Sequence, residues 1–127
     1  MSGDAVEVAT HARPTGSVIW LHGLGADGHD FEPVVPELMR HRPLALRFVF
    51  PHAPVRAVTL NGGYPMRAWY DILGLDRQSS QDEAGIRASD AAIRALVSRE
   101  NQRGIATDRI VLAGFSQGGA MALYSGV

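Results

Sequence analysis

Residues 109–124 read Arg-Ile-Val-Leu-Ala-Gly-Phe-Ser-Gln-Gly-Gly-Ala-Met-Ala-Leu-Tyr, so that a serine flanked by glycines separates two apolar runs. The first run is short and rich in branched aliphatic side chains, which is typical of a buried strand. The segment between the runs, 114–118, matches the pattern G-x-S-x-G. We predict a strand over 109–113, a tight turn over 114–119 and a helix that continues through 120–124.

This turn gives the serine a chemical use. A serine hydroxyl is a weak nucleophile, and a sharp strand-to-helix turn presents it clear of the sheet, with small residues on either side. The helix that follows directs its N-terminus at the serine and favours negative charge there. Ser116 is therefore the candidate nucleophile, and the backbone N–H of Gln117 is a candidate donor to the oxyanion of a tetrahedral intermediate. The alternative interpretation is a glycine-rich turn that contains a serine by chance.

Other strands and turns are predicted upstream of this motif. Residues 17–21 and 46–50 are short apolar runs, and Pro51 follows the second run. Residues 61–63, Asn-Gly-Gly, indicate a turn, and residues 69–73 are expected to be extended.

Helices are predicted between these strands. Two prolines favour a turn and then a short helix over 30–40, with Asp30 as a cap. Ser80 and Glu83 have the spacing of a capping box, and Gly104 is placed as a C-cap. The helix between them has one apolar face, formed by Ile86, Ile93, Leu96 and Val97. This alternation predicts a single α/β domain with a mostly parallel sheet and flanking helices.

The glycine-rich loop at 22–29 supports two interpretations. Residues 23–28 spell G-x-G-x-x-G after a strand, the fingerprint of dinucleotide binding. However, no helix is expected to open inside this segment, and the next strand ends without the acidic residue that would bind a ribose. In a protein with a nucleophilic serine, such a loop instead supplies the second oxyanion donor, because glycines let the backbone approach a substrate closely. Leu24 is the candidate for that donor.

The amino-acid composition excludes several classes of partner and chemistry for this protein. The chain has 127 residues, 46% of them hydrophobic and 20% charged, which fits one globular domain. A net charge of −1 argues against nucleic acid as a partner, and the absence of cysteine and lysine excludes thiolate metal sites and Schiff-base chemistry. The N-terminus lacks the pattern of a signal peptide and no apolar run is long enough to span a bilayer, so a cytoplasmic location is expected. Asp27, His29 and Asp30 are interpreted as loop polarity, and neither a metal nor a cofactor is predicted.

Four blocks of the sequence together resemble the phospholipase/carboxylesterase family, which includes the acyl-protein thioesterases. They are Leu-His-Gly-Leu-Gly-Ala-Asp-Gly at 21–28, Phe-Pro-His-Ala-Pro at 50–54, Met-Arg-Ala-Trp-Tyr-Asp at 66–71 and Gly-Phe-Ser-Gln-Gly-Gly-Ala at 114–120. Each block alone is modest, but their order and spacing extend over nearly the whole chain.

The resemblance implies an α/β-hydrolase fold and cofactor-free hydrolysis of carboxylic esters or thioesters through an acyl-enzyme on Ser116. It implies that the N–H groups of Leu24 and Gln117 form the oxyanion hole. It further implies that His22 and Gly23 belong to the oxyanion loop and support it, and that the segment from Met66 to Trp69 lies near the acyl-binding groove. For Trp69 and Tyr70, packing in the core is an equal alternative, and Asp71 is expected to be structural. The expected substrate is a small-molecule or lipid acyl ester, or an acylated protein.

The chain departs from this family in its length. The family's triad runs Ser, then Asp, then His, but residues 117–127 contain neither aspartate nor histidine. We therefore expect an incomplete domain, truncated after the nucleophile helix, that is part of a longer protein and nearly inactive alone. Recruitment of an upstream histidine, with His22 as the nearest candidate, is the alternative. The strand at 109–113 would keep an unpaired apolar edge, a candidate site for self-association.

Overall fold

The computed structural model describes residues 5–74 and 81–126. Strands alternate with helices along much of the chain, as the sequence predicts. In chain order the elements are β1 (Ala5–Ala9), β2 (Gly16–Leu21), α1 (Val34–His41), β3 (Leu46–Pro51), β4 (Val55–Val58), a 3₁₀ turn (Thr59–Asn61), β5 (Tyr64–Arg67), α2 (Glu83–Gln102), a 3₁₀ turn (Thr107–Arg109), β6 (Ile110–Gly114) and α3 (Gln117–Gly126).

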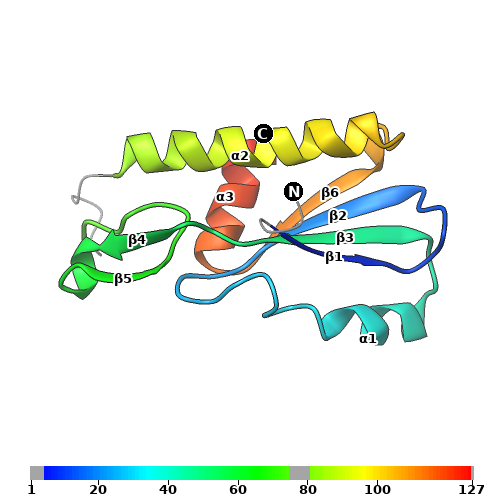
Figure 1. The fold of residues 1–127 in the computed structure, drawn as a ribbon, viewed down its shortest axis with the longest axis horizontal. Helices are drawn as coiled ribbons and strands as arrows, with labels where there is room; N and C mark the ends of the chain where they lie inside the picture. Colours follow the sequence, from blue (N-terminus) through cyan, green and yellow to red (C-terminus); the bar gives the residue numbers. More distant parts are fainter. Residues whose placement is uncertain (1–4, 75–80, 127) are drawn as a thin grey trace.

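The main sheet has the strand order β1-β3-β2-β6. Strand β2 pairs in parallel with both β3 and β6, whereas β1 pairs antiparallel with β3. The carboxyl ends of β2, β3 and β6 therefore lie together, and the separate β4–β5 hairpin extends beyond them (Figure 1). In open α/β sheets, ligands bind at this end of the strands.

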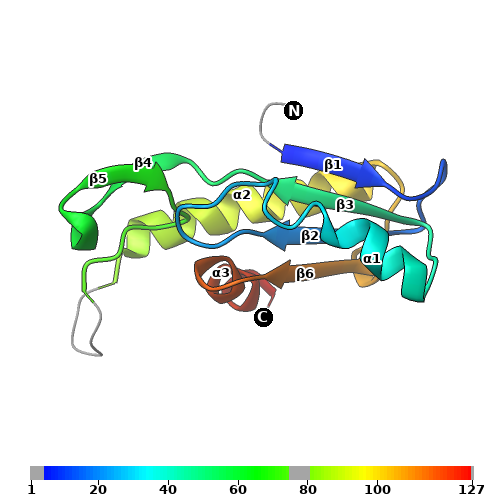
Figure 2. The same cartoon turned by 90° about the horizontal axis from the view of Figure 1, so that it is seen from below.

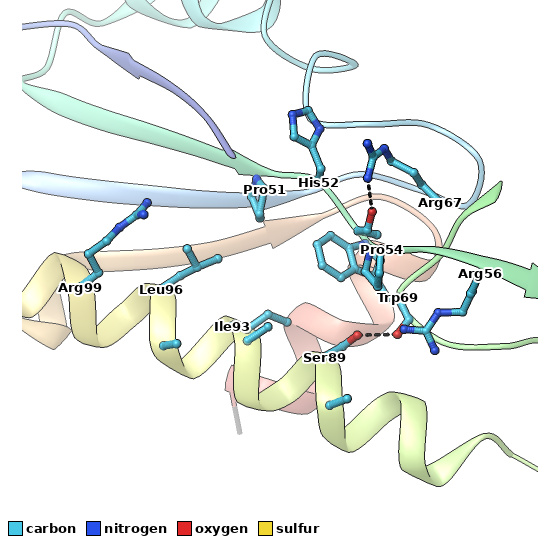
Figure 3. Close-up of a pocket in the computed structure, with 14 residues that line it drawn as sticks. Pro51, His52, Pro54, Arg56, Arg67, Trp69, Ser89, Ile93, Leu96 and Arg99 are labelled. Carbon is cyan, nitrogen blue, oxygen red and sulfur yellow. Dashed lines mark hydrogen bonds between the residues drawn. The ribbon is translucent and has the colours of Figure 1, made fainter. Parts of the chain in front are cut away.

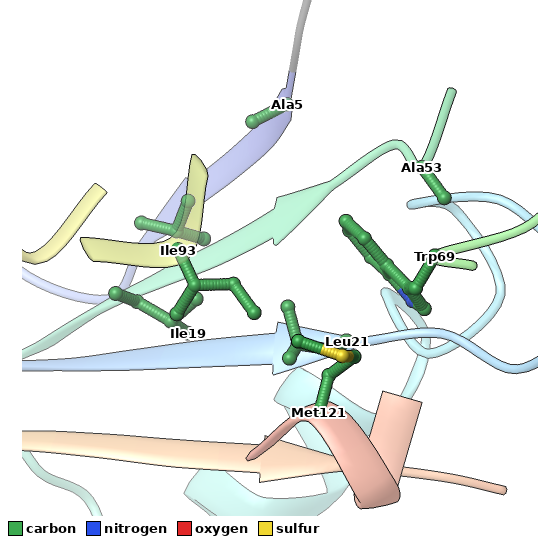
Figure 4. Packing of buried hydrophobic residues seen from close by; sticks show 8 residues of the cluster. Ala5, Ile19, Leu21, Ala53, Trp69, Ile93 and Met121 are labelled. Atoms are coloured by element: carbon green, nitrogen blue, oxygen red, sulfur yellow. The ribbon is translucent and has the colours of Figure 1, made fainter. Parts of the chain in front are cut away.

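Helices cover both faces of the sheet. Helix α1 lies on one face, and α2 and α3 lie on the other (Figures 1 and 2). Because side chains alternate along a strand, Ile19 and Leu21 pack toward α2 and α3 with Met121 (Figure 4). On the opposite face, the α1 side, Phe48 and Phe50 form a second cluster. The predicted mostly parallel α/β sheet with flanking helices is confirmed.

An ion network ties the amino ends of the strands to the end of α2. The Glu100 side chain is 1% exposed, and its Oε1 accepts hydrogen bonds from Ser17 Oγ at 2.5 Å and Arg47 Nη1 at 2.7 Å. Arg103 links Glu100 to Glu7 on β1. Burial alone raises the pKa of Glu100, but the hydrogen bonds from Ser17 and Arg47 outweigh it and hold that pKa below its usual value. The network joins four separate elements far from the candidate nucleophile.

Several local predictions are confirmed. The strands at 16–21, 46–51 and 110–114 and the short helix after the glycine-rich loop form where expected. Gly104 follows α2 with φ 94°, as a helix C-cap requires, and Gly62 and Gly63 occupy a turn with positive φ. Ile93 is buried against the sheet, and the other three residues of the predicted apolar face of α2 pack around it.

Other local predictions are wrong. The N-cap of α2 is Asp82, whose side chain accepts from the Gly85 N–H, while Ser80 lies outside the described residues. Asp30 does not cap α1, because the helix begins later, after Pro33, without a side-chain cap. Residues 69–73 are not extended throughout as expected, because residues 69 and 70 form a bend.

Strand β6 is an edge of the described sheet, with β2 on one side only. Its Val111 side chain is 57% exposed on the face that α1 covers elsewhere. Leu123 and Tyr124 of α3 are exposed as well. The apolar edge expected from the sequence is therefore present in the structure.

Candidate active site

Ser116 lies at the turn between β6 and α3, with its side chain exposed. Its φ is 57°, in the left-handed region that L-residues rarely adopt, and no other non-glycine residue of the described chain has a positive φ. Within the described residues, no hydrogen bond engages its hydroxyl. Such strain concentrates at functional positions where the surrounding structure enforces it, and here it turns the serine out at the carboxyl end of the sheet.

Close backbone contacts explain the two glycines of the motif. A Cβ at Gly114 would lie 2.3 Å from the carbonyl oxygen of Gly118. A Cβ at Gly118 would lie 2.2 Å from the carbonyl oxygen of Leu21, at the end of β2. Each distance is far below an ordinary contact, so the turn can close only without side chains at these positions.

The glycine-rich loop packs directly against this turn. A Cβ at Gly23 would lie 3.4 Å from Ser116 Cβ and 3.2 Å from the Phe115 ring. Leu24 follows, and its backbone N–H donates to none of the residues that the structure describes. Gln117 is the first residue of α3, where the N–H has no partner inside the helix. Both predicted oxyanion donors are thus beside the serine turn and uncommitted to the described structure.

The loop does not have the form of a dinucleotide site. A helix should open inside residues 23–28, but α1 begins only at Val34. Gly28 instead packs against β3, where a Cβ would lie 2.3 Å from the carbonyl oxygen of Phe50. Gly23 and Gly28 therefore permit close packing of the loop, whereas Gly25 has a positive φ of 80°.

His22 is a fixed, buried part of the loop. Its side chain is 2% exposed; the ring Nδ1 donates to the Gly23 carbonyl at 2.7 Å and Nε2 accepts from the Ala53 N–H at 3.0 Å. Burial lowers the pKa of His22, which keeps the ring neutral. With both nitrogens occupied, His22 supports the loop and has no free atom to act as a base for Ser116.

Three further histidines are engaged away from the serine. His52 Nδ1 accepts from the Gly28 N–H, and His11 Nδ1 accepts from the Arg13 N–H. His29 pairs with Glu32, whose hydrogen bond raises the pKa of this exposed imidazole. Among the described residues, no histidine ring hydrogen-bonds to Ser116, and no cluster has the composition of a metal site.

Trp69 lies in the hydrophobic core. It is 3% exposed and belongs to the buried cluster of Figure 4. Its ring packs against His22, with the ring centroids 5.2 Å apart. The Trp69 Nε1–H donates to the His22 carbonyl at 2.9 Å, and the Ser89 hydroxyl donates to the Trp69 carbonyl. The packing alternative thus describes its position, and a role of Trp69 in substrate binding stays a prediction.

Met66 and Asp71 flank this segment differently. Met66 is half-buried on β5 beside the oxyanion loop, with its Sδ 3.8 Å from a Cβ built on Gly25. Asp71 accepts from the Thr59 N–H at 2.7 Å and from the Thr59 hydroxyl, and these bonds lower the pKa of its carboxyl. Asp71 is therefore structural, as expected.

A cavity of about 560 Å³ lies on the α2 side of the β3–β4 connection (Figure 3). Trp69, Ile93 and Leu96 line it, with arginines at its two ends. Ser116, Leu24 and Gln117 do not line it. The cavity is therefore separate from the candidate nucleophile, although Trp69 belongs to the surroundings of both.

Sequence reasoning missed Ser89 and Arg67 as supports of the site. Ser89 is an ordinary helix position in the sequence, and only its contact with Trp69 reveals the role. Arg67 Nη1 donates to the Ala53 carbonyl at 2.7 Å, which ties the end of β5 to the residue that also holds His22. Arg67 does fall inside the block at 66–71, the signal that could have identified it.

Known proteins share this architecture. The model of the Phospholipase/Carboxylesterase family matches residues 3–127. The chain is 44% identical over 122 residues to acyl-protein thioesterase 1 of Neurospora crassa, an alignment that covers 91% of this chain and 50% of that protein. The structure resembles crystal structures of Zea mays acyl-protein thioesterase 2 (TM-score 0.77, 33% identity, 95% of this chain and 49% of that one) and Arabidopsis thaliana SOBER1 (TM-score 0.80, 31% identity, 87% and 53%).

The chain spans about half the length of the curated relatives it matches. The matched half contains the serine turn and the glycine-rich loop, which the structure brings together. The chain therefore belongs to the phospholipase/carboxylesterase family and has the α/β-hydrolase fold.

Proposed function

We propose that this chain supplies the nucleophile and the oxyanion hole of a serine hydrolase that cleaves acyl esters or thioesters. The left-handed backbone of Ser116, enforced between Gly114 and Gly118, is the observation on which the proposal rests. A positive φ is uncommon in a residue other than glycine, and a nucleophile elbow requires this strained backbone.

The proposed reaction is acyl transfer to water. Ser116 Oγ attacks the carbonyl carbon, and its proton passes to a histidine that an aspartate orients. The N–H groups of Leu24 and Gln117 receive the oxyanion. The bond to the leaving alcohol or thiol then breaks, the histidine returns the proton to it, and water hydrolyses the acyl-enzyme by the same steps. In this proposal the histidine and aspartate belong to the part of the whole protein that this chain does not span, because the chain covers about half of its relatives and no described histidine ring hydrogen-bonds to Ser116.

The names of the relatives support a substrate class for the whole protein. The matched proteins include acyl-protein thioesterases, so we propose an acyl group in ester or thioester linkage, carried by a lipid, a small molecule or a protein. No helix among the described residues is long and apolar enough to cross a membrane. The expected cytoplasmic location and the absence of nucleic acid as a partner stay predictions.

A fluorophosphonate probe tests the assignment in the whole protein. Intact-protein mass spectrometry should show one adduct, and peptide mapping should place it on Ser116. The variant Ser116→Ala should lose labelling and ester hydrolysis, whereas the control Ser98→Ala, an exposed serine of α2, should retain both. Hydrolysis that survives Ser116→Ala unchanged would rule out the proposed nucleophile and favour a non-catalytic binding role.

The 127 residues assayed alone give a second test. Removal of triad partners from known serine enzymes leaves a rate roughly 10³–10⁴-fold above water, because binding and the oxyanion hole persist. The isolated chain should therefore show at most this residual hydrolysis. Full activity of these residues alone would require a base among the upstream histidines and would overturn the proposed division of the site.

A further inference from the structure

The segment 67–70, which we name the bridge, lies between the two proposed oxyanion donors. It begins at the last residue of β5 and contacts both the glycine-rich loop and the start of α3. The loop and the serine turn also touch directly, through the Phe115 N–H bonded to the Leu21 carbonyl at 3.1 Å. That bond fixes the end of β2, but Leu24 lies beyond it along the loop.

On the loop side, the bridge holds residues on both flanks of Leu24. The Gly25 N–H donates to the Arg67 carbonyl at 2.9 Å. The indole N–H of Trp69 donates to the His22 carbonyl at 2.9 Å. Because peptide units are planar, fixing the backbone before and after Leu24 restricts the direction of its N–H.

On the side of the serine turn, the side chain of Gln117 hydrogen-bonds to the same segment. Its Oε1 accepts from the Trp69 N–H at 2.7 Å, and its Nε2 donates to the Tyr70 carbonyl at 2.9 Å. The Gln117 residue is 5% exposed, so these bonds are made away from water. Trp69 is held from a third direction by Ser89 of α2 (Figure 3).

We propose that the side chain of Gln117 and the indole of Trp69 are positioning groups that set the two oxyanion N–H donors relative to each other through the bridge. This inference rests on the proposed function, since it gives Gln117 a second role beside its backbone N–H. The two roles separate cleanly by substitution, because every residue except proline keeps the backbone N–H while the side-chain amide can be removed.

The expected effect is on the rate and not on substrate binding. The oxyanion exists only in the tetrahedral intermediate and the transition states around it, so misplaced donors weaken those states and leave the bound ester largely unaffected. Misplacement by about 1 Å can cost roughly 10²-fold in rate. We expect kcat to fall about 10- to 100-fold, with KM within about twofold.

Two variants and a matched control test this in the whole protein. Gln117→Met keeps the length of the side chain and removes both of its hydrogen bonds. Trp69→Phe keeps a smaller aromatic ring and, of the three hydrogen bonds of Trp69, removes the one to His22. Ser17→Ala is the control, because it also removes a buried hydrogen bond but lies in the Glu100 network at the opposite ends of the strands. The readouts are kcat and KM for a p-nitrophenyl ester, with functional sites counted by fluorophosphonate titration, and the affinity for a trifluoromethyl ketone.

The possible results distinguish the positioning role of the bridge from the proposed function itself. A lower kcat per titrated site in both variants, with weaker ketone binding and an unchanged control, supports the positioning role. If both variants keep kcat per site within about twofold while only the number of titratable sites falls, the bridge is merely structural and the inference is wrong. If Gln117→Met yields no folded protein, Trp69→Phe decides alone. If the unaltered protein is not labelled at Ser116, the proposed function fails, and the positioning role fails with it.

Discussion

Replacing the candidate nucleophile by glycine should make the protein more stable while abolishing its activity. Ser116 has φ 57°, and a left-handed backbone costs an L-residue about 1–2 kcal/mol that glycine does not incur. Glycine in turn loses about 0.5–1 kcal/mol more than other residues through its greater freedom in the unfolded chain. The Ser116 side chain is exposed and makes no hydrogen bond within the described chain, so little else is lost. The difference predicts a gain between about 0 and 1.5 kcal/mol in the free energy of unfolding, with a midpoint of about 0.8 kcal/mol.

Urea unfolding of the whole protein, followed by circular dichroism, measures this gain. The matched control is Ser98→Gly, the same chemical change at an exposed position inside α2. Glycine in a helix interior is less favourable than serine, so the control should lose about 0.5 kcal/mol. Opposite signs for the two serines are the expected result. If Ser116→Gly destabilises as much as Ser98→Gly, the left-handed backbone is not a strained state, and the argument that links it to function loses its basis.

The other predictions concern the network, the turn and the sheet edge. Glu100→Gln should lower the free energy of unfolding by about 3–5 kcal/mol, because Arg47 is left in a mostly buried position without a charged partner. Glu7→Gln, at a partly exposed pair, should lower the free energy of unfolding by about 1 kcal/mol or less in the same urea titration. Hydrogen bonds and arginine charges hold the pKa values of both glutamates below their usual value. The free energy of unfolding that they contribute is therefore complete above about pH 5 and is lost as the pH falls through their folded pKa values. A free energy of unfolding that increases on acidification through that range would contradict this prediction. Gly118→Ala should lower the free energy of unfolding by about 1–3 kcal/mol and abolish fluorophosphonate labelling, because the new methyl group meets the backbone of β2. Val111→Lys on the exposed edge should reduce self-association of the 127-residue chain in sedimentation velocity, and an unchanged distribution would show that this edge is not the contact.

The central strands and the serine turn could be predicted because their signals are local. Three apolar runs of strand length, each with a glycine or proline within two residues of its end, predicted β2, β3 and β6. The hairpin of β4 and β5 gave no such signal. Pro65 in β5 argues against a strand, and β4, which pairs with β5, is only four residues long. Strand β1 is a five-residue edge that depends on pairing with β3 for its form. These elements are stabilised by partners distant in the sequence, which local patterns do not contain.

The cap of α2 shows the same limit within one turn of helix. Ser80 and Asp82 are both acceptable caps by residue type. Asp82 is chosen in the structure, where its carboxylate also accepts from the Asp71 N–H at 2.8 Å and lies near Arg56. A tertiary contact therefore decides between two locally equivalent starts.

In the candidate site, too, only the features that depend on a short segment could be predicted from the sequence. The motif at 114–118 and the glycine-rich loop could be assigned from residue types, because each is a property of one short segment. The hydrogen bonds of Gln117 and Trp69 join residues 48 positions apart, and no spacing rule predicts them. The left-handed φ of Ser116 also becomes visible only in three dimensions.

The contact between Gly118 and the Leu21 carbonyl has a consequence for how Ser116 acquires its conformation. The turn packs against the Leu21 carbonyl, which also accepts from the Phe115 N–H, so its final shape depends on β2 lying beside β6. Without that pairing, Ser116 is an ordinary serine on a flexible backbone, with neither the outward presentation nor the second N–H donor. If Ser116 is the proposed nucleophile, its reactivity would therefore depend on long-range sheet assembly and not on the local motif alone.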